Sequence, residues 1–360
     1  MIDIFRSIQT LIKLGTVHTD NNVFKLHYKI TVVLLAGFSI LLTSKQYFGE
    51  PIDCDVEQRK ETIDTFCWIH GTFIVNENLG DSRVPGLGII SKAHEPGSNG
   101  KDSPTNSQNY YQWICLIFGF QAVLFYLPRY LWKACEAGRL KELVGEFGGP
   151  LVSDKWNQME RDKLLANFLG STHIHNMYTF RYCFCEVLNM LNVIANIYFM
   201  DWLVTGEFAG YGIHHATYKT VNPMDRVFPK IAKCTYYKYG PSGDVQLLDA
   251  LCILPLNVLN EKVFLILWYW FYILLFFSVL CVVYRGLFVC LPSFRTYLLR
   301  AQTRKTDRKK AKFIIEKISY GDFFVLYKFG KNVNPTLYKD IVNSLYEQLL
   351  SRYPYRVQDL

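Results

Sequence analysis

A run of 22 residues from Val263 to Tyr284 contains neither a charged residue nor a proline. The hydrocarbon core of a bilayer is about 30 Å thick, and a helix that rises about 1.5 Å per residue needs roughly 20 apolar residues to cross it. Core helices of soluble domains usually keep one polar face, which this run lacks. The run therefore predicts a membrane-spanning helix, and it prompts a search for further spans.

Three other segments approach the same length, so we predict spans over residues 28–48, 110–132, 182–204 and 263–286. The third is interrupted by Glu186, Asn189, Asn192 and Asn196. At about 100° per residue, these four fall within roughly 120° of the helix circumference. They form one polar stripe that should face protein or water rather than lipid, although a buried helix of a soluble domain is the alternative for this segment. The expected fold class is an all-α membrane protein, a four-transmembrane-helix bundle.

Lysine and arginine are unevenly distributed between the segments that connect these spans. Of 39 such residues, 27 lie in residues 1–29, 129–181 and 285–360. Positively charged residues favour the cytoplasmic side, so both termini and the middle loop should be cytoplasmic. We expect cytoplasmic segments at 1–27, 133–181 and 287–360, and extracellular loops at 49–109 and 205–262. The first cytoplasmic segment is patterned as an amphipathic helix, and the last as several short helices.

Each predicted extracellular loop contains one pair of cysteines. Cys54 and Cys67 lie in the first loop and Cys234 and Cys252 in the second, whereas the other six of the 10 cysteines lie in spans or cytoplasmic segments. Disulfides persist in oxidising compartments, so the cysteines support the same topology as the charges. Four cysteines allow three connectivities, and their spacing selects none of them. A zinc site is the competing interpretation, but the short Cys-x-x-Cys knuckle is missing.

The second span opens on four residues with distinctive side chains: Tyr110, Tyr111, Gln112 and Trp113. Amphipathic rings favour the membrane–water interface, so we expect the aromatic ones in the outer interfacial belt. Near the other end, Pro128 cannot donate a hydrogen bond to the carbonyl group of Leu124. The helix should bend there, and a neighbouring helix should cover the freed carbonyl. The bend is either a gating hinge or a static kink.

Chemical signatures of other protein classes are missing. The sequence contains no HExxH, Walker or GxSxG motif, so we expect no enzyme, no cofactor and no metal site. The topology accounts for the net charge of +8, so nucleic-acid binding is not expected either.

Several short motifs occur along nearly the whole chain: DNNVFKLHYK at 20–29, PIDC at 51–54, DTFCWI at 64–69, YYQW at 110–113, FPKIAKCT at 228–235, YGPSG at 239–243, LCILPLNVLNEK at 251–262 and GDFFVLYKFGKN at 321–332. Their combination resembles the innexins, the gap-junction proteins of invertebrates. Connexins resemble this architecture but carry three cysteines in each outer loop, where this chain carries two.

The resemblance implies a subunit of an intercellular gap-junction channel in the plasma membrane. Its oligomeric hemichannels, usually octamers, dock on those of the adjacent cell, pass ions and small metabolites, and also open undocked. The implied partners are copies of this chain, other innexins and membrane lipids. The resemblance also implies disulfides Cys54–Cys252 and Cys67–Cys234. In such channels the N-terminal helix folds into the pore, which makes four residues candidates for the constriction: Met1, Asp3, Phe5 and Arg6.

Acidic residues, Asp53 and Asp55 among them, directly follow the first span. A ring of copies would gather them at a negative mouth, so we expect these two to line the pore and to favour cations in the undocked channel. A four-span adhesion or scaffold protein, which also uses disulfide-stapled outer loops, is the alternative to a channel.

Overall fold

The computed structural model describes residues 17–56, 60–75, 105–108, 110–147, 157–217, 228–304 and 306–353. Met1, Asp3, Phe5 and Arg6 lie outside these ranges. The chain divides into two compact units, which we call the tail unit (Met1–Thr31, Leu124–Asn192 and Leu274–Leu360) and the cap unit (Val32–Val123 and Val193–Ile273). Each has a hydrophobic core of its own.

Within the described ranges, four helices are long and apolar enough to cross a membrane: Asn22–Phe48, Ile114–Glu136, Ile174–Leu203 and Pro255–Cys290. Together with the two disulfides, they confirm the expected fold class of a four-helix membrane protein. The helices α8 (Thr172–Leu203) and α11 (Pro255–Cys290) extend beyond the apolar segments. The helix α5 (Ile114–Glu136) contains Pro128 and starts after a separate 3-10 turn, η4 (Tyr110–Gln112).

The cap unit also contains a five-stranded antiparallel sheet, which the sequence patterns did not predict. Its strands follow one another in hydrogen-bonding order: β1 (Asp53–Asp55), β5 (Val245–Ile253), β4 (Ile231–Tyr239), β2 (Thr72–Val75) and β3 (Thr105–Gln108). The remaining described helices of this unit are α3 (Val32–Phe48), α4 (Lys60–His70) and α9 (Tyr211–Thr217).

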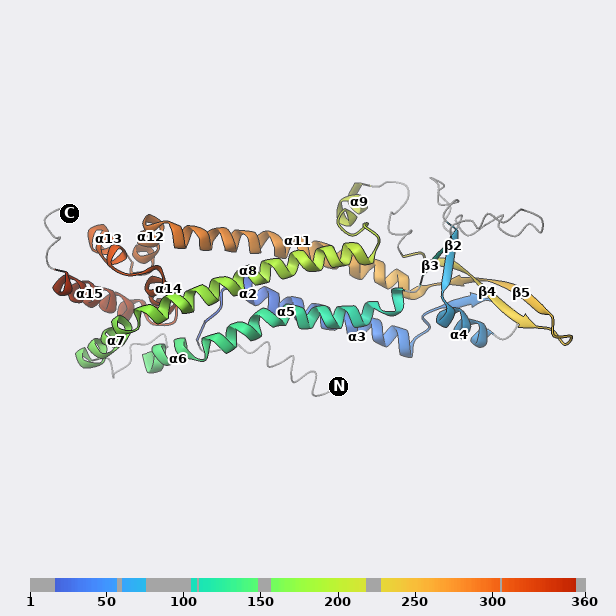
Figure 1. Ribbon diagram of the computed structural model, residues 1–360, viewed down its shortest axis with the longest axis horizontal. Helices are drawn as coiled ribbons and strands as arrows, with labels where there is room; N and C mark the ends of the chain where they lie inside the picture. The colour runs from blue at the N-terminus through green and yellow to red at the C-terminus, as the bar shows by residue number, and fades with distance from the viewer. Residues whose placement is uncertain are drawn as a thin grey trace. The chain divides into compact units, whose positions relative to one another are not determined.

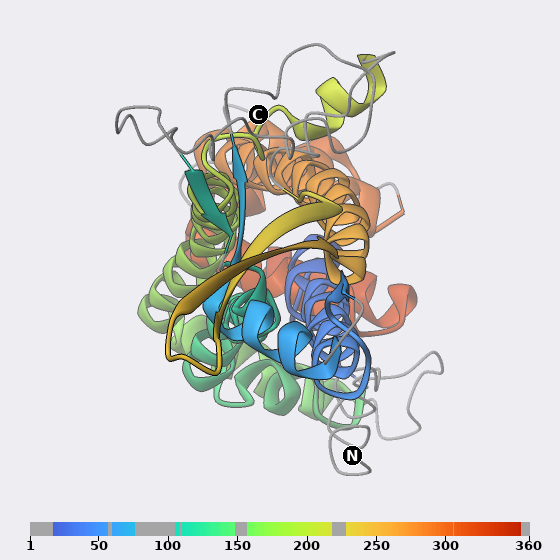
Figure 2. The same cartoon turned by 90° about the vertical axis from the view of Figure 1, so that its right-hand side faces the viewer.

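The strands β4 and β5 form a hairpin that is paired from Ile231–Ile253 to Tyr239–Val245. Gly243 in the turn has φ +83°, a left-handed conformation that glycine adopts without steric cost. The N–H of Gly240 closes the turn by donating to the carbonyl of Asp244 at 2.9 Å. Figures 1 and 2 show the hairpin projecting beyond α4, which packs against β1 and β4.

The tail unit is helical in its described residues. Besides parts of α5, α8 and α11 it contains α2 (Asn22–Lys25), the π-helical turn η1 (Leu26–Thr31), α6 (Arg139–Val144), the 3-10 turn η5 (Gly145–Phe147), α7 (Gln158–Gly170), α12 (Pro292–Gln302), α13 (Arg308–Lys317), α14 (Tyr320–Gly330) and α15 (Pro335–Arg352). Figure 1 shows α12 to α15 gathered at the C-terminal end of α11.

The helix α14 lies at the centre of the tail unit. Its apolar residues occur on all sides, and Phe323 and Phe324 are completely buried, as expected for a helix that is enclosed by others. A capping box formed by Ser319 and Asp322 satisfies backbone N–H groups at its first turn. The helix α15 packs against α13 and α7 and is capped by Asn334.

Candidate functional site

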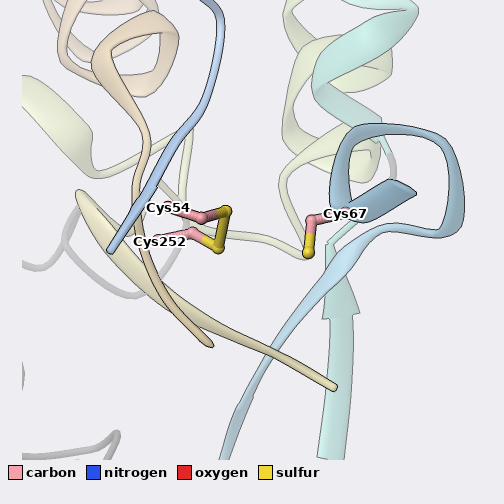
Figure 3. Close-up of side chains that lie close together, drawn as sticks. All are labelled: Cys54, Cys67 and Cys252. Atoms are coloured by element: carbon pink, nitrogen blue, oxygen red, sulfur yellow. A yellow bond between two sulfur atoms is a disulfide. The ribbon is translucent and has the colours of Figure 1, made fainter. Parts of the chain in front are cut away.

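Two disulfides join the segments of the cap unit. Cys54 of β1 is bonded to Cys252, its partner across the sheet in β5, and Cys67 of α4 is bonded to Cys234 of β4. This is the pairing that the family resemblance implies. Figure 3 shows the Cys54–Cys252 bond with the Cys67 side chain beside it, and the sulfur atoms of these three residues lie within 4.8 Å of one another. Because all four sulfurs are oxidised to disulfides, they do not offer the thiolate ligands that a zinc site requires.

The disulfides connect parts of the chain that are far apart in sequence. The bonded residues are separated by 198 and 167 positions, and all four cysteines are at most 1% exposed. The core around them is small and contains Ile52, Ile63, Ala232, Ala250 and Leu254. In the chain-entropy model, closing a loop of this length contributes about 4–5 kcal/mol. The disulfides therefore supply stability that so small a core does not.

The β4–β5 hairpin has two unlike faces. On one face, Ala232, Cys234, Ala250 and Cys252 are buried in the core that surrounds the disulfides. The other face bears apolar side chains that are between 45% and 71% exposed: Tyr237, Tyr239, Val245, Leu247, Leu251 and Ile253. An apolar patch of this kind on a projecting element is typical of an interaction surface. Sequence reasoning missed it, although the period-two alternation of β4 and β5 carries the signal.

The acidic residues that follow the first span differ in their surroundings. Asp64 accepts a hydrogen bond from the N–H of Cys54 at 2.8 Å and so anchors β1 to α4, and burial raises the pKa of its carboxyl group. Asp53 lies 2.6 Å from the Nζ atom of Lys60. Asp55 is exposed and has no ion pair within the described part of the chain. Of the two candidate mouth residues, Asp55 thus carries the less compensated charge.

The YYQW motif connects the start of α5 to the first outer loop. The ring of Tyr111 is 2% exposed and lies 5.0 Å from the ring of Trp68 in α4. The side-chain amide of Gln112 donates to the carbonyl of Trp68. The helix α4 folds over Tyr111 and removes its ring from the surface, and its place in the interfacial belt stays a prediction. Trp113, by contrast, is 62% exposed, as expected for a residue of the aromatic belt.

The polar stripe of the third span is largely buried in the described structure. Glu186, Asn189 and Asn196 are 6%, 3% and 3% exposed, which confirms that the stripe faces protein. Asn192 donates from Nδ2 to the carbonyl oxygen of Leu124 at 3.3 Å, and this is the carbonyl that Pro128 leaves without its helical partner. The expectation that a neighbouring helix covers it is therefore confirmed. The gating function of Pro128 stays a prediction.

Buried ion pairs, which sequence reasoning missed, occur in the tail unit. Arg285 binds both carboxylate oxygens of Glu186, from Nε at 2.6 Å and from Nη2 at 2.8 Å, and the two side chains are 9% and 4% exposed. Asp20 accepts hydrogen bonds from Arg129 at 2.8 Å and from the indole N–H of Trp132 at 3.1 Å. Charges are tolerated at such burial only when they are paired and hydrogen-bonded. The one local signal was the position of Arg285 directly after an apolar run.

Comparison with known proteins gives consistent matches over the whole chain. The Innexin family model matches residues 20–349. The chain is 43% identical to Innexin inx2 of Drosophila melanogaster over 356 residues, in an alignment that covers 97% of this chain and 96% of the relative. It is 44% identical to Innexin inx2 of Schistocerca americana, covering 97% and 98%. It is 36% identical to Innexin shaking-B of Drosophila melanogaster, covering 100% and 98%.

Proposed function

Because the chain belongs to the innexin family, which forms gap-junction channels in invertebrates, we propose that it spans the plasma membrane four times with both termini in the cytoplasm. Innexins are a channel family and not an enzyme family. The main support for this topology is the two disulfides that join residues 49–109 to residues 205–262. Because disulfides persist outside the cell, both loops should be extracellular. The concentration of Lys and Arg in the other segments supports it independently.

The assembled unit is an octameric hemichannel that docks through its cap units on a hemichannel of the adjacent cell. The exposed apolar face of the β4–β5 hairpin supports this assembly, because six large apolar side chains would otherwise stay in water. The partners are copies of this chain or other innexins. The docked pair passes ions and small metabolites between the two cytoplasms, and the undocked hemichannel also opens.

The pore is lined by residues from two parts of the chain. The N-terminal segment folds into the channel, and Met1, Asp3, Phe5 and Arg6 form its constriction. Asp53 and Asp55 form an acidic ring at the outer mouth and give the undocked hemichannel a preference for cations. Lys60 offsets part of the charge of Asp53, so Asp55 makes the larger contribution to this preference.

Transfer of a small dye between paired cells that both express the chain tests the channel against a four-span adhesion protein. A channel transfers the dye, whereas an adhesion protein joins the cells without transfer. A protease-cleavable tag at either terminus tests the topology on intact cells: it should be cleaved only after permeabilisation, and cleavage without permeabilisation contradicts the proposal. An image of the purified assembly then gives the number of subunits.

A further inference from the structure

The connector, residues 18–21, lies between the N-terminal segment and α2 and is bound by side chains from several elements of the tail unit. Asn21 caps α2, because its Oδ1 atom accepts from the N–H of Phe24 at 2.6 Å. The Nδ2 atom of Asn21 donates to Glu186 at 2.7 Å. With Asp20 held by Arg129 and Trp132, the C-terminal half of the connector is fixed to the C-terminal end of α5 and to α8.

The N-terminal half of the connector is bound by the last turn of α14 and the residues after it. The N–H of His18 donates to Oδ1 of Asn332 at 2.6 Å, and Nδ2 of Asn332 donates back to the carbonyl of His18 at 3.2 Å. One side-chain amide thus satisfies both backbone groups of His18, as a neighbouring β-strand would. The same Nδ2 atom also donates to the carbonyl of Lys328 at 2.8 Å, which fixes the amide to α14.

Lys328 binds the next residue of the connector. Its Nζ atom donates to the carbonyl of Thr19 at 2.8 Å and lies 3.3 Å from the hydroxyl of Tyr182. That hydroxyl oxygen accepts the N–H of Asn21 at 3.2 Å. The ammonium group is 4.5 Å from the centroid of the Tyr182 ring, and the residue is 5% exposed. Burying a lysine side chain costs free energy. The placement of Lys328 at the Thr19 carbonyl therefore indicates that it positions the connector.

The helix α14 is itself firmly held, so it is a stable platform for these contacts. His175 of α8 lies 2.8 Å from the carboxylate of Asp322, and Asn176 accepts the N–H of Gly321 at 3.1 Å. A Cβ atom on Gly321 would lie 2.6 Å from the backbone N and Cα atoms of Asn176, so α14 and α8 approach as closely as only glycine permits. The position of α14 therefore determines where the N-terminal half of the connector is bound.

We propose that Lys328 and Asn332 are positioning residues for the N-terminal pore segment: they bind the backbone of His18 and Thr19 and thereby set the point from which residues 1–16 enter the channel. This inference rests on the proposed function, in which the N-terminal segment lines the pore. It assigns the cytoplasmic tail a direct mechanical link to the constriction, since the residues that bind the connector belong to the C-terminal helical region. A shift of α14 would move the start of the pore segment with it.

Hydrogen exchange of the purified, full-length assembly tests the binding of the connector. In Asn332→Ala the backbone amide of His18 loses its acceptor, so its exchange rate should rise by about tenfold. The backbone amides of α15 are the internal control, because a general loosening of the fold would raise their exchange rates as well. Lys331→Met is the matched control for Lys328→Met, because Lys331 is the residue directly after α14 and its Nζ atom lies 4.6 Å from the centroid of the Tyr327 ring rather than at the connector.

Junctional conductance between paired cells tests the consequence for the pore. Asn332→Ala and Lys328→Met should lower it by roughly fivefold or more at equal surface abundance, while Lys331→Met retains most of it. Unchanged exchange at His18 overturns the inference, and so does raised exchange with wild-type conductance. If Asp3→Asn leaves the single-channel conductance unchanged, the N-terminal segment does not line the pore, and the proposed function and this inference both fail. The exchange result at His18 distinguishes this case, because the binding of the connector would still be observed.

Discussion

The cap unit and the tail unit are stabilised by different kinds of bonds. The cap unit has a small core, and two disulfides and a backbone-bonded sheet hold it together. The tail unit has a much larger apolar core in which Asp20, Glu186, Arg285 and Lys328 are also buried. A disulfide resists changes of pH but not reductants, whereas a buried charge tolerates reductants but not the loss of its partner. Each unit should therefore fail under conditions that the other withstands.

The largest effect is expected when the cap unit loses a disulfide. The double substitution Cys67→Ser and Cys234→Ser avoids leaving a thiol near the Cys54–Cys252 bond. Because Cys54–Cys252 remains and shortens the loop that Cys67–Cys234 closes, it should destabilise the cap unit by about 3–4 kcal/mol and abolish dye transfer between paired cells. Cys290→Ser is the control, because Cys290 is an exposed free thiol in α11. Normal dye transfer by the double variant would show that the cap unit does not depend on this bond.

A smaller effect is expected when the tail unit loses one member of an ion pair. Glu186→Gln leaves Arg285 buried without its counter-charge and should lower the free energy of unfolding by about 3 kcal/mol. Adding Arg285→Met removes the uncompensated charge and should restore part of the loss. Thermal unfolding of the purified protein measures both variants. Equal destabilisation in the single and the double variant would mean that the pair contributes through packing and not through charge.

The stability of the tail unit should also depend on pH through Lys328. Burial, reinforced by Arg285, lowers the pKa of the Lys328 amine from 10.5 to about 7, against the opposing influence of Glu186 and Asp20. Between pH 7 and 9 the folded state then binds fewer protons than the unfolded state, so the free energy of unfolding should rise by up to about 1.4 kcal/mol per pH unit.

Thermal unfolding at several pH values measures this slope. Lys328→Met should reduce it, whereas Lys331→Met should change it only slightly, because Lys331 is exposed directly after α14 and is the weakest of the charges that lower the pKa of Lys328. An unaltered slope in Lys328→Met would mean that other groups cause the pH dependence. The pH sensitivity of the tail unit would then not come from this buried lysine.

The smallest effect concerns the charges at the mouth of the cap unit. Asp55→Asn should shift the reversal potential of undocked hemichannels toward that of anions by a few millivolts. Asp53→Asn should shift it by a similar amount, because it removes the same unit of negative charge and leaves Lys60, 2.6 Å away in the wild type, without its counter-charge. Currents measured in asymmetric salt give both values. An unchanged reversal potential in both variants would mean that neither carboxylate acts on the permeating ions.

Much of the helical framework follows from local properties of the sequence. An apolar run such as Val263 to Tyr284 needs no partner to be recognised, because its length alone matches the bilayer. The polar stripe of the third span and the carbonyl freed by Pro128 were also foreseeable, since helical periodicity and proline chemistry act within a few residues. The cysteines showed that the outer loops are stapled, and the family resemblance implied which bonds form.

The sheet and the buried contacts of the tail unit were decided by tertiary structure. Strand β1 is three residues long, and the paired residues Cys54 and Cys252 of β1 and β5 are 198 positions apart, so no local pattern predicts this strand. Tyr111 is removed from the surface only because α4 folds over it. His18 and Asn332 are 314 residues apart in sequence, and hydrogen bonds over such separations leave no periodicity to detect. The sequence by itself determined which segments are apolar enough to enter the membrane, because that depends on local composition; the tertiary structure decided which polar groups meet, because that depends on where distant segments come together.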